Sequence, residues 1–461
     1  MSHWKPDPAR LGRPAYLSLA DQYVRAIRAG SLGPGDRLPP HRSLAYDLGL
    51  SVQTVSRAYR ELIRRGLISG EVGRGSFVLP PAAESAPPYL AERPSEIVDL
   101  SILKPVSEPM HLQLLRDGLH WVADHMAAPA ALSFRPSSIM PVHRRIAADW
   151  LARGGVEASP DSIVITDGAT SAVTTAVMAA VVPGGTLAAE ALTHHLLMPL
   201  CQYLGVSLEG LAMDGEGLLP EALDQAARRG AVRAVYLQPA AINPLAILMP
   251  PARRAEIVEV ARRHDLAIIE NDMLNAMIAP RPAPFAALAP ERVFHINGFT
   301  KSTLPGLRLA YLTVPERFAA AAANRHLVTN WVATPVMVEL LSHWITDGTV
   351  DELIRWQRAA LAGRQALAAE VLAGVPFRSH PQALHLWLDL PPGRREDEFV
   401  TQARLRGVAI ASGRAFRLGE GSGPAVRIAL GATRAEDLRR GLGVVAEMLR
   451  SEPAEALLPL F

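Results

Sequence analysis

Residues 298–312 read GFTKSTLPGLRLAYL, a polar turn with one lysine that lies between two apolar runs. The run before it is VFHIN at Val293–Asn297. Short apolar runs bounded by Gly and Pro are typical of buried strands. The pattern therefore predicts that Lys301 closely follows a strand, with the hydroxyl of Thr300 and the guanidinium of Arg308 near it in the chain.

Similar apolar runs recur along the C-terminal three quarters of the chain, separated by segments with a helical pattern such as 220–229 and 251–264. The predicted strands are Ser162–Thr166, Thr186–Glu190, Ala234–Gln238, Leu266–Glu270, Val293–Asn297 and Leu309–Val314. This alternation predicts an α/β fold with a mainly parallel sheet covered by helices on both faces. Because such sheets bind ligands at the carboxyl ends of their strands, the polar residues found there are candidate site residues.

Several of these residues have a chemical use in binding pyridoxal phosphate. The cofactor's aldehyde forms a Schiff base with an amine, which Lys301 supplies. The backbone N–H groups of Ala169 and Thr170, at the start of a predicted helix, suit a phosphate. Thr300 and Arg308 add a hydroxyl and a positive charge beside the lysine.

Four further candidates follow other predicted strands. Asn243 can donate to the ring hydroxyl of the cofactor, and the flat side chain of His194 can stack on the ring, although a structural histidine next to His195 is an open alternative. Asn271 and Asp272 are polar residues that directly follow the predicted strand Leu266–Glu270. The histidine spacing does not indicate a metal site, and the single Cys201 excludes an internal disulfide or a cysteine cluster.

A different pattern precedes residue 80. Residues 38–78 read LPPHRSLAYDLGLSVQTVSRAYRELIRRGLISGEVGRGSFV. Ser51 can cap a helix with Val52, Val55, Tyr59 and Leu62 on one face, and a Gly-rich turn between apolar runs then predicts a hairpin. The opposite face carries donors for phosphates and base edges, namely Gln53, Thr54, Ser56, Arg57, Arg60 and Arg64. The segment predicts a helix-turn-helix followed by a wing.

The charge distribution agrees with a double-stranded DNA partner. Residues 1–80 contain 12 Lys and Arg against 6 Asp and Glu, whereas the whole chain has 47 against 45. The remaining 381 residues therefore carry 35 against 39, a net charge of −4. Positive charge is concentrated where a polyanion could use it.

The chain length and a Pro-rich stretch indicate two domains. The stretch LPPAAESAPPYLAERPSEI at 79–97 has the composition of a semi-rigid linker. We therefore expect a DNA-binding domain at 1–79, a linker at 80–98 and an effector and dimerisation domain at 99–461. The sequence shows neither a membrane-spanning run nor a signal peptide, so a cytoplasmic protein is expected.

Residues 15–79 resemble the winged helix-turn-helix of the GntR family. The resemblance implies that Gln53, Thr54, Ser56 and Arg57 lie near the major groove and that Arg74 lies at the tip of the wing. Residues 99–461 resemble the fold type I aminotransferases, and the whole chain resembles the MocR subgroup of GntR regulators, which combines both parts.

The aminotransferase resemblance assigns roles to individual residues. Lys301 becomes the Schiff-base lysine, Asn243 the asparagine of QPxxxNP, and Arg308 the phosphate arginine. Arg427, in AVRIAL, becomes the clamp for a substrate or effector carboxylate, although an ordinary ion-pair partner is the alternative.

The chain departs from the family pattern at four places. In ENDMLNAM, Asn271 takes the place of the aspartate that pairs with the pyridine nitrogen, and Leu274 replaces a tyrosine. A register shifted by one would give the nitrogen to Asp272 instead. Gly298 replaces the usual serine three residues before the lysine, and 245–246 read Leu-Ala instead of Thr-Gly.

Because an amide holds the pyridine nitrogen protonated less well than a carboxylate does, these departures favour a regulator over an enzyme. We expect a homodimeric transcription regulator that binds pyridoxal phosphate and DNA and senses an amino compound or the cofactor itself. The alternatives are an active aminotransferase with a DNA-binding head, and a dimerisation scaffold with a vestigial site. Neither the effector, nor the operator, nor the direction of regulation follows from the sequence.

Overall fold

The structure is a computed structural model, and the chain forms two compact units, residues 1–92 and 93–461. It describes residues 4–28, 31–33, 35–64, 67–71, 75–78, 97–134, 140–419, 423–431 and 433–451. All but the last two residues of the expected linker at 80–98 lie outside this set. No helix in the described part of the chain is long and apolar enough to cross a membrane.

The first unit contains three helices and a hairpin, as the sequence predicts. They are α1 (Ala15–Arg28), α2 (His41–Leu48), α3 (Val52–Arg64), β1 (Ile68–Glu71) and β2 (Gly75–Val78), after a short 3₁₀ turn at Pro8–Arg10. The two strands pair antiparallel, with Ile68 opposite Val78. The core of this unit is formed by residues of all three helices and of the hairpin.

Local signals explain the turn between α2 and α3. Gly49 ends α2 with φ 63°, a conformation that favours glycine, and Ser51 Oγ accepts a hydrogen bond of 3.0 Å from the backbone amide of Thr54. Tyr59 and Leu62 of α3 are buried as expected, but the expectation for Val52 is wrong, because its side chain is 44% exposed. Val52 is the first residue of α3, where no neighbouring helix covers it.

The larger unit is built on a seven-stranded sheet. Its strands are β4 (Ile163–Thr166), β5 (Thr186–Glu190), β6 (Ser207–Leu211), β9 (Val232–Leu237), β10 (Ala267–Asn271), β11 (Val293–Gly298) and β12 (Ala310–Thr313). Their order is β4-β12-β11-β10-β9-β5-β6, and only β12 runs antiparallel to its neighbours. The six predicted strands are all present, whereas the edge strand β6 was not predicted.

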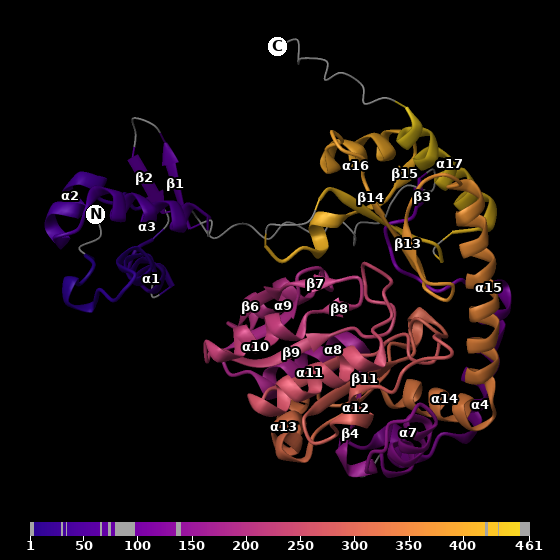
Figure 1. The fold of residues 1–461 in the computed structure, drawn as a ribbon. Coiled ribbons are helices and arrows are strands. Elements are labelled where there is room, and N and C mark those ends of the chain that lie inside the picture. The colour runs from indigo at the N-terminus through magenta and orange to yellow at the C-terminus, as the bar shows by residue number, and fades with distance from the viewer. Residues whose placement is uncertain are drawn as a thin grey trace. The chain divides into compact units, whose positions relative to one another are not determined.

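Helices cover both faces of this sheet (Figure 1). Alternate strand residues enter two separate apolar clusters, for example Val235 on one face and Tyr236 on the other. The helices of the lobe are α7 (Pro141–Arg153), α8 (Ala169–Ala180), α9 (Leu197–Tyr203), α10 (Pro220–Arg228), α11 (Pro251–Arg263), α12 (Phe285–Leu288) and α13 (Ala319–Asn330). Helix α8 packs in the cluster that contains Tyr236, and α7, α10 and α11 pack in the other.

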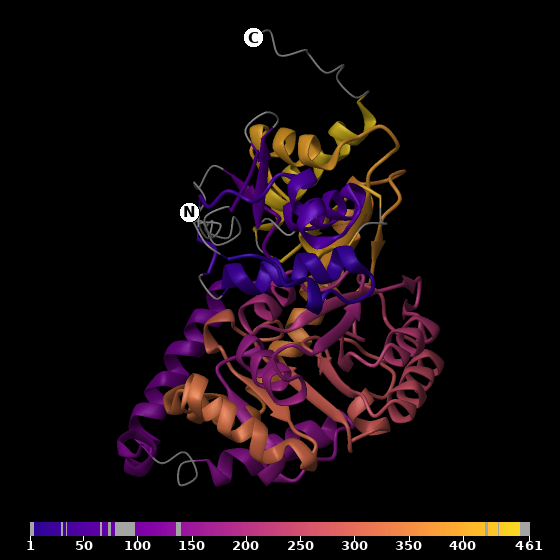
Figure 2. The same ribbon diagram turned by 90° about the vertical axis from the view of Figure 1, so that its left-hand side faces the viewer.

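A smaller lobe contains the sheet β13-β14-β17-β16, with α16 and α17 against it. Its elements are β3 (Val98–Asp99), β13 (Arg378–Ser379), β14 (His385–Asp389), α16 (Glu396–Leu405), β15 (Val408–Ala409), β16 (Ala411–Ser412), β17 (Ala425–Ala429) and α17 (Ala435–Arg450). Helix α15 (Thr349–Val371) connects the two lobes, which stack in both views (Figures 1 and 2).

Helix α14 (Pro335–Thr346) packs against α15 and also against α4 (Pro109–His125) and α5 (Ala128–Leu132). The remaining short elements are the hairpin β7 (Met213–Asp214) with β8 (Gly217–Leu218) and 3₁₀ turns at Pro160–Ser162, Pro305–Leu307, Glu316–Phe318 and Gly413–Phe416.

Candidate functional site

The carboxyl ends of the parallel strands gather the predicted site residues at one edge of the large sheet. Asn271 is the last residue of β10 and Gly298 the last residue of β11, and the two strands are neighbours. The chain then turns through Lys301 before it returns as β12. Inside this turn, the Oγ1 of Thr303 donates to the carbonyl oxygen of Phe299 at 2.8 Å. The turn is therefore fixed by its own hydrogen bonds.

Lys301 lies among other positive charges. Burial, with smaller effects from the charges of Arg427, Arg308 and Lys104, lowers its pKa from 10.5 to about 8. Its Nζ donates a hydrogen bond to the carbonyl oxygen of Leu103. A lower pKa increases the neutral fraction of the amine near pH 7, which is the nucleophilic form.

Arg427 lies in the middle of β17, and only 3% of the residue is exposed. Its Nη1 donates to Asn243 Oδ1 at 2.9 Å, and its Nη2 donates to the carbonyl oxygen of Ser101 at 2.6 Å. The guanidinium carbon lies 4.6 Å from the centre of the Phe416 ring. Burial lowers the pKa of Arg427 to about 10. All of these neighbours are uncharged. Among the described residues, Arg427 therefore has no carboxylate partner of the kind that the ion-pair alternative requires.

Arg308 lies beside the start of α8. A side-chain carbon added at Gly168, which precedes this helix, would lie 3.4 Å from Arg308 Nη2. Gly168 has φ 88°, which favours glycine at this close approach. The helix continues through Ala169, which is half-buried, and Thr170, which is exposed. The structure thus joins a guanidinium to a helix N-terminus, an arrangement that suits a phosphate.

His194 is half-buried and belongs to the same neighbourhood. Burial lowers its pKa well below the usual range, and His195, Lys301 and Arg427 add smaller effects in the same direction. The centres of the His194 and His195 rings are 4.6 Å apart. An imidazole with so low a pKa is neutral at pH 7, which suits a flat group for stacking.

Asn271 and Asp272 have different partners. Asn271 Nδ2 donates to the hydroxyl of Tyr236 at 2.6 Å, and its buried Oδ1 has no partner among the described residues. Asp272 Oδ2 instead pairs with Arg281 Nη1 at 2.6 Å and His295 Nε2 at 3.2 Å. Although burial alone would raise it, the hydrogen bond to His295 and the charge of Arg281 keep the pKa of Asp272 low.

Met273, which sequence reasoning did not single out, also lies at this edge. Met273 fills the space beside Gly298, since a side-chain carbon added at Gly298 would lie 2.2 Å from Met273 Sδ. The unusual glycine was the only signal for this contact. Leu274, by contrast, is buried in the main apolar cluster and supplies no polar group.

Glu190, the last residue of β5, was also missed. It is completely buried, and neither carboxyl oxygen has a hydrogen-bond partner among the described residues. Burial raises its pKa from 4.5 to about 8, because its effect outweighs the opposite effect of the nearby backbone amide of Gln238. Glu190 is therefore mainly protonated at neutral pH.

The predicted DNA face of α3 divides into two groups. Gln53, Arg57 and Arg60 are exposed, and the Arg57 guanidinium lies 4.2 Å from the centre of the Tyr16 ring. Thr54 and Ser56 are half-buried, with Thr54 Oγ1 2.8 Å from Ser51 Oγ and Ser56 Oγ 3.0 Å from His41 Nδ1. Arg74 lies outside the described residues.

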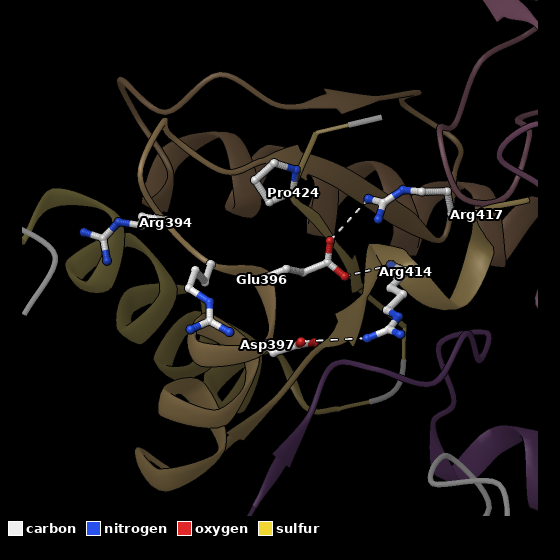
Figure 3. A pocket seen from close by; sticks show the side chains of 7 residues that line it. Arg394, Glu396, Asp397, Arg414, Arg417 and Pro424 are labelled. Atoms are coloured by element: carbon white, nitrogen blue, oxygen red, sulfur yellow. Dashed lines mark hydrogen bonds and ion pairs between the residues drawn. The ribbon is translucent and has the colours of Figure 1, made fainter. Parts of the chain in front are cut away.

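A separate pocket of about 350 Å³ opens at the start of α16. Its lining includes Glu396, which accepts from Arg417 Nη2 at 3.3 Å and from the Arg414 backbone at 2.7 Å, and Asp397, whose Oδ2 lies 3.9 Å from Arg414 Nη1 (Figure 3). Because its charges pair with one another, we assign it a structural role. Within the described residues, no group of His, Cys, Asp and Glu could hold a metal ion.

Comparison with known proteins agrees with this geometry. Residues 115–445 match the family model for aminotransferase class I and II, and residues 15–78 match that for bacterial regulatory proteins of the gntR family. The kynurenine aminotransferase of Pyrococcus horikoshii superposes with a TM-score of 0.70 at 22% identity, over 77% of this chain and 91% of the enzyme. At this identity the likeness shows the fold alone.

Two regulators are similar over most of the chain. The HTH-type transcriptional regulator YdeF of Bacillus subtilis is 28% identical over 459 residues, which cover 97% of this chain and 96% of YdeF. The vitamin B6 salvage pathway transcriptional repressor PtsJ of Salmonella typhimurium is 29% identical over 380 residues, which cover 80% and 84% of the two chains.

The raised pKa of Glu190 predicts a pH-dependent stability. The folded state keeps the proton up to about pH 8, whereas the unfolded state releases it near 4.5, so stability falls as pH rises between these values. Glu190→Gln removes this dependence. Between pH 5 and 8, the melting temperature of the unaltered protein should fall relative to that of the variant by about 2 °C or more.

Scanning calorimetry of the full chain measures this difference. Glu221→Gln, an exposed substitution on α10, is the matched control and should follow the unaltered protein at every pH. A difference between Glu190→Gln and the unaltered protein that stays constant with pH would contradict the assignment.

Proposed function

The chain belongs to the aminotransferase class I and II family, and on this premise we propose that its larger unit binds pyridoxal phosphate and controls the DNA binding of its GntR-type head. The family matches confirm the expected winged helix-turn-helix with a fold type I aminotransferase-like domain, the MocR-type combination of a transcription regulator. The observation that carries the proposal is that Arg308 and Arg427 lie close enough to Lys301 to lower its pKa, within a larger unit that is fused to such a head.

The residues present fit this cofactor. Lys301 offers an amine with a lowered pKa, Arg308 and the start of α8 suit the phosphate, and the orphaned Asn271 Oδ1 faces no protein donor. His194 supplies a flat neutral ring, and Asn243, held through its Oδ1 by Arg427, supplies an amide donor. When bound, pyridoxal phosphate supplies an aldehyde that captures amines.

Arg427 determines which amines would be held. A buried guanidinium binds a carboxylate through two parallel hydrogen bonds, so we propose an effector that carries both an amine and a carboxylate. Sensing of pyridoxal phosphate itself is the second candidate, which the name of the relative PtsJ favours.

Asn271 argues against an efficient aminotransferase. Removal of a proton from the effector carbon requires a ring nitrogen that stays protonated, and a neutral amide stabilises that proton less than a carboxylate does. Asp272 already serves Arg281 and His295, which supports the register in which Asn271 faces the ring. Binding of an amine with a carboxylate needs only Lys301 and Arg427. A sensing function is therefore compatible with Asn271.

The head would use Gln53, Arg57 and Arg60 as its first contacts with double-stranded DNA, because they are exposed on α3. Thr54 and Ser56 would approach DNA only through their partly exposed surfaces. We also propose a homodimer, since paired heads on a two-fold axis match paired operator half-sites.

Lys301→Ala should abolish covalent attachment of the cofactor. The chain has only three lysines, Lys5, Lys104 and Lys301, so borohydride reduction followed by peptide mass spectrometry can assign every adduct. The unaltered protein should carry the pyridoxyl group on Lys301. Lys104→Ala, the matched control, should retain it, and an adduct that persists on another lysine in Lys301→Ala would remove Lys301 from this role.

Replacing Arg57 and Arg60 together by alanine should weaken DNA binding about ten-fold or more at 0.15 M salt and should lower the salt slope by roughly 2, because two phosphate contacts are lost. Fluorescence anisotropy with duplexes selected by the protein from a random pool measures both. Arg439→Ala with Arg440→Ala, on the exposed face of α17, is the matched control. Equal affinities would place α3 outside the interface.

Asn271→Asp should accelerate conversion of the cofactor to its amine form by about ten-fold or more, since a carboxylate raises the pKa of the ring nitrogen. Stopped-flow absorbance with a panel of amino acids follows the conversion. Rapid conversion by the unaltered protein would contradict the sensor proposal. An unchanged rate in Asn271→Asp would instead assign the ring nitrogen to Asp272.

A further inference from the structure

The first described segment of the larger unit lies against the proposed cofactor site. Strand β3 pairs with β15, and the backbone amide of Leu100 donates to Ala409 at 2.8 Å. The carbonyl of Leu100 in turn accepts from the amide of Ala429 at 2.7 Å. These bonds hold residues 98–100 beside β17, the strand that carries Arg427.

Two of the next three residues, Ser101 and Leu103, contact the side chains on which the proposed function depends. The carbonyl oxygen of Ser101 accepts from Arg427 Nη2 at 2.6 Å, and that of Leu103 accepts from Lys301 Nζ. Both acceptors are backbone atoms of one short segment, residues 101–103. Neither contact joins Lys301 or Arg427 to a carboxylate, so each positive charge is satisfied here only by a neutral oxygen.

Cofactor attachment competes with the contact at Lys301. The ammonium group has three N–H bonds, and condensation with an aldehyde releases one water and leaves at most one N–H on the nitrogen. The same nitrogen is then bonded to the cofactor carbon, which fixes its direction. Nζ can therefore no longer donate to the carbonyl oxygen of Leu103 in the same geometry.

An effector carboxylate competes in the same way at Arg427. A guanidinium binds a carboxylate in parallel through Nε and Nη2 or through Nη1 and Nη2, and both arrangements use Nη2. Within the described residues, Nε has no partner, whereas Nη2 is bound by Ser101 and Nη1 by Asn243. A carboxylate must therefore take or share the contact that Ser101 makes.

We propose that residues 101–103 are an internal competitor for the site, held there without ligand and released when cofactor and a carboxylated amine occupy Lys301 and Arg427. This inference rests on the proposed function and adds the way in which occupancy is reported. Along the chain, residues 80–97 connect the two units and are followed by β3 and then by residues 101–103. Release of residues 101–103 would therefore act on this connection through β3.

A reporter on the segment tests release directly. Lys104 is exposed, and the single native cysteine, Cys201, is buried, so Lys104→Cys can be labelled selectively with an environment-sensitive dye in the full chain. Pyridoxal phosphate is added first and a panel of amino acids second. Dye emission should change in step with the cofactor absorbance, whereas a dye on Thr401→Cys, exposed on α16, should stay constant.

A substitution tests the competition independently. Leu103 packs through its side chain against the main apolar cluster, so Leu103→Ala loosens the carbonyl that faces Lys301. Pyridoxal phosphate should then bind at least about three-fold more tightly, because the competing contact is weaker. Leu115→Ala removes a similar side chain from the same cluster but not from the segment, and should leave the affinity unchanged.

The outcomes separate the two proposals. If the unlabelled protein shows no cofactor absorbance and no borohydride adduct, the proposed function fails and this inference falls with it. If the cofactor binds while the Lys104→Cys dye stays silent and Leu103→Ala binds no more tightly than Leu115→Ala, only the inference is overturned.

Discussion

The site depends on positive charges that form no ion pair among the described residues. Arg308 and Arg427 lie close enough to Lys301 to lower its pKa, in the same direction as burial does. The hydrogen-bond partners of Lys301 and Arg427 are neutral oxygens. Such a cluster is stabilised most by a ligand that brings its own negative groups. A phosphate near Arg308 and a carboxylate at Arg427 would supply them, so ligand binding and the electrostatic stability of the larger unit are linked.

Under the proposed function, the replacement of one carboxylate by Asn271 would separate the sensing of an amine from catalysis. Asn271 keeps a polar atom at the end of β10, and its hydrogen bond to Tyr236 fixes the amide. The acidic neighbour Asp272 is held by Arg281 and His295. Under the proposed function, the site would keep Lys301 and Arg427 for an amine and a carboxylate, while Asn271 would offer the ring nitrogen an amide in place of a carboxylate. Met273 beside Gly298 fills a further part of this edge with an apolar side chain.

Much of this arrangement could be predicted from the sequence, because it depends on local patterns. Apolar runs predicted six strands, and the residues after the five of them that run parallel must share one edge of the sheet. The contacts of Ser101 and Leu103 could not be predicted, because every residue has a backbone carbonyl and the residue type does not indicate which carbonyl makes a contact. The buried acid Glu190 was missed for another reason: its strand has no motif that distinguishes it from an ordinary core strand. The exposure of Val52 was not predicted, because helical periodicity shows which face of a helix is apolar but not which turns of that face are buried.

The central claim is that occupancy of the Lys301 site changes DNA binding. The most direct measurement is the affinity of the full chain for a selected duplex, by anisotropy at fixed salt, as pyridoxal phosphate and then an amino acid are added. The account predicts a change of about three-fold or more that saturates with the cofactor absorbance and is absent in Lys301→Ala. An affinity that stays constant through saturation with cofactor and the whole amino-acid panel, or that changes equally in Lys301→Ala, would contradict it.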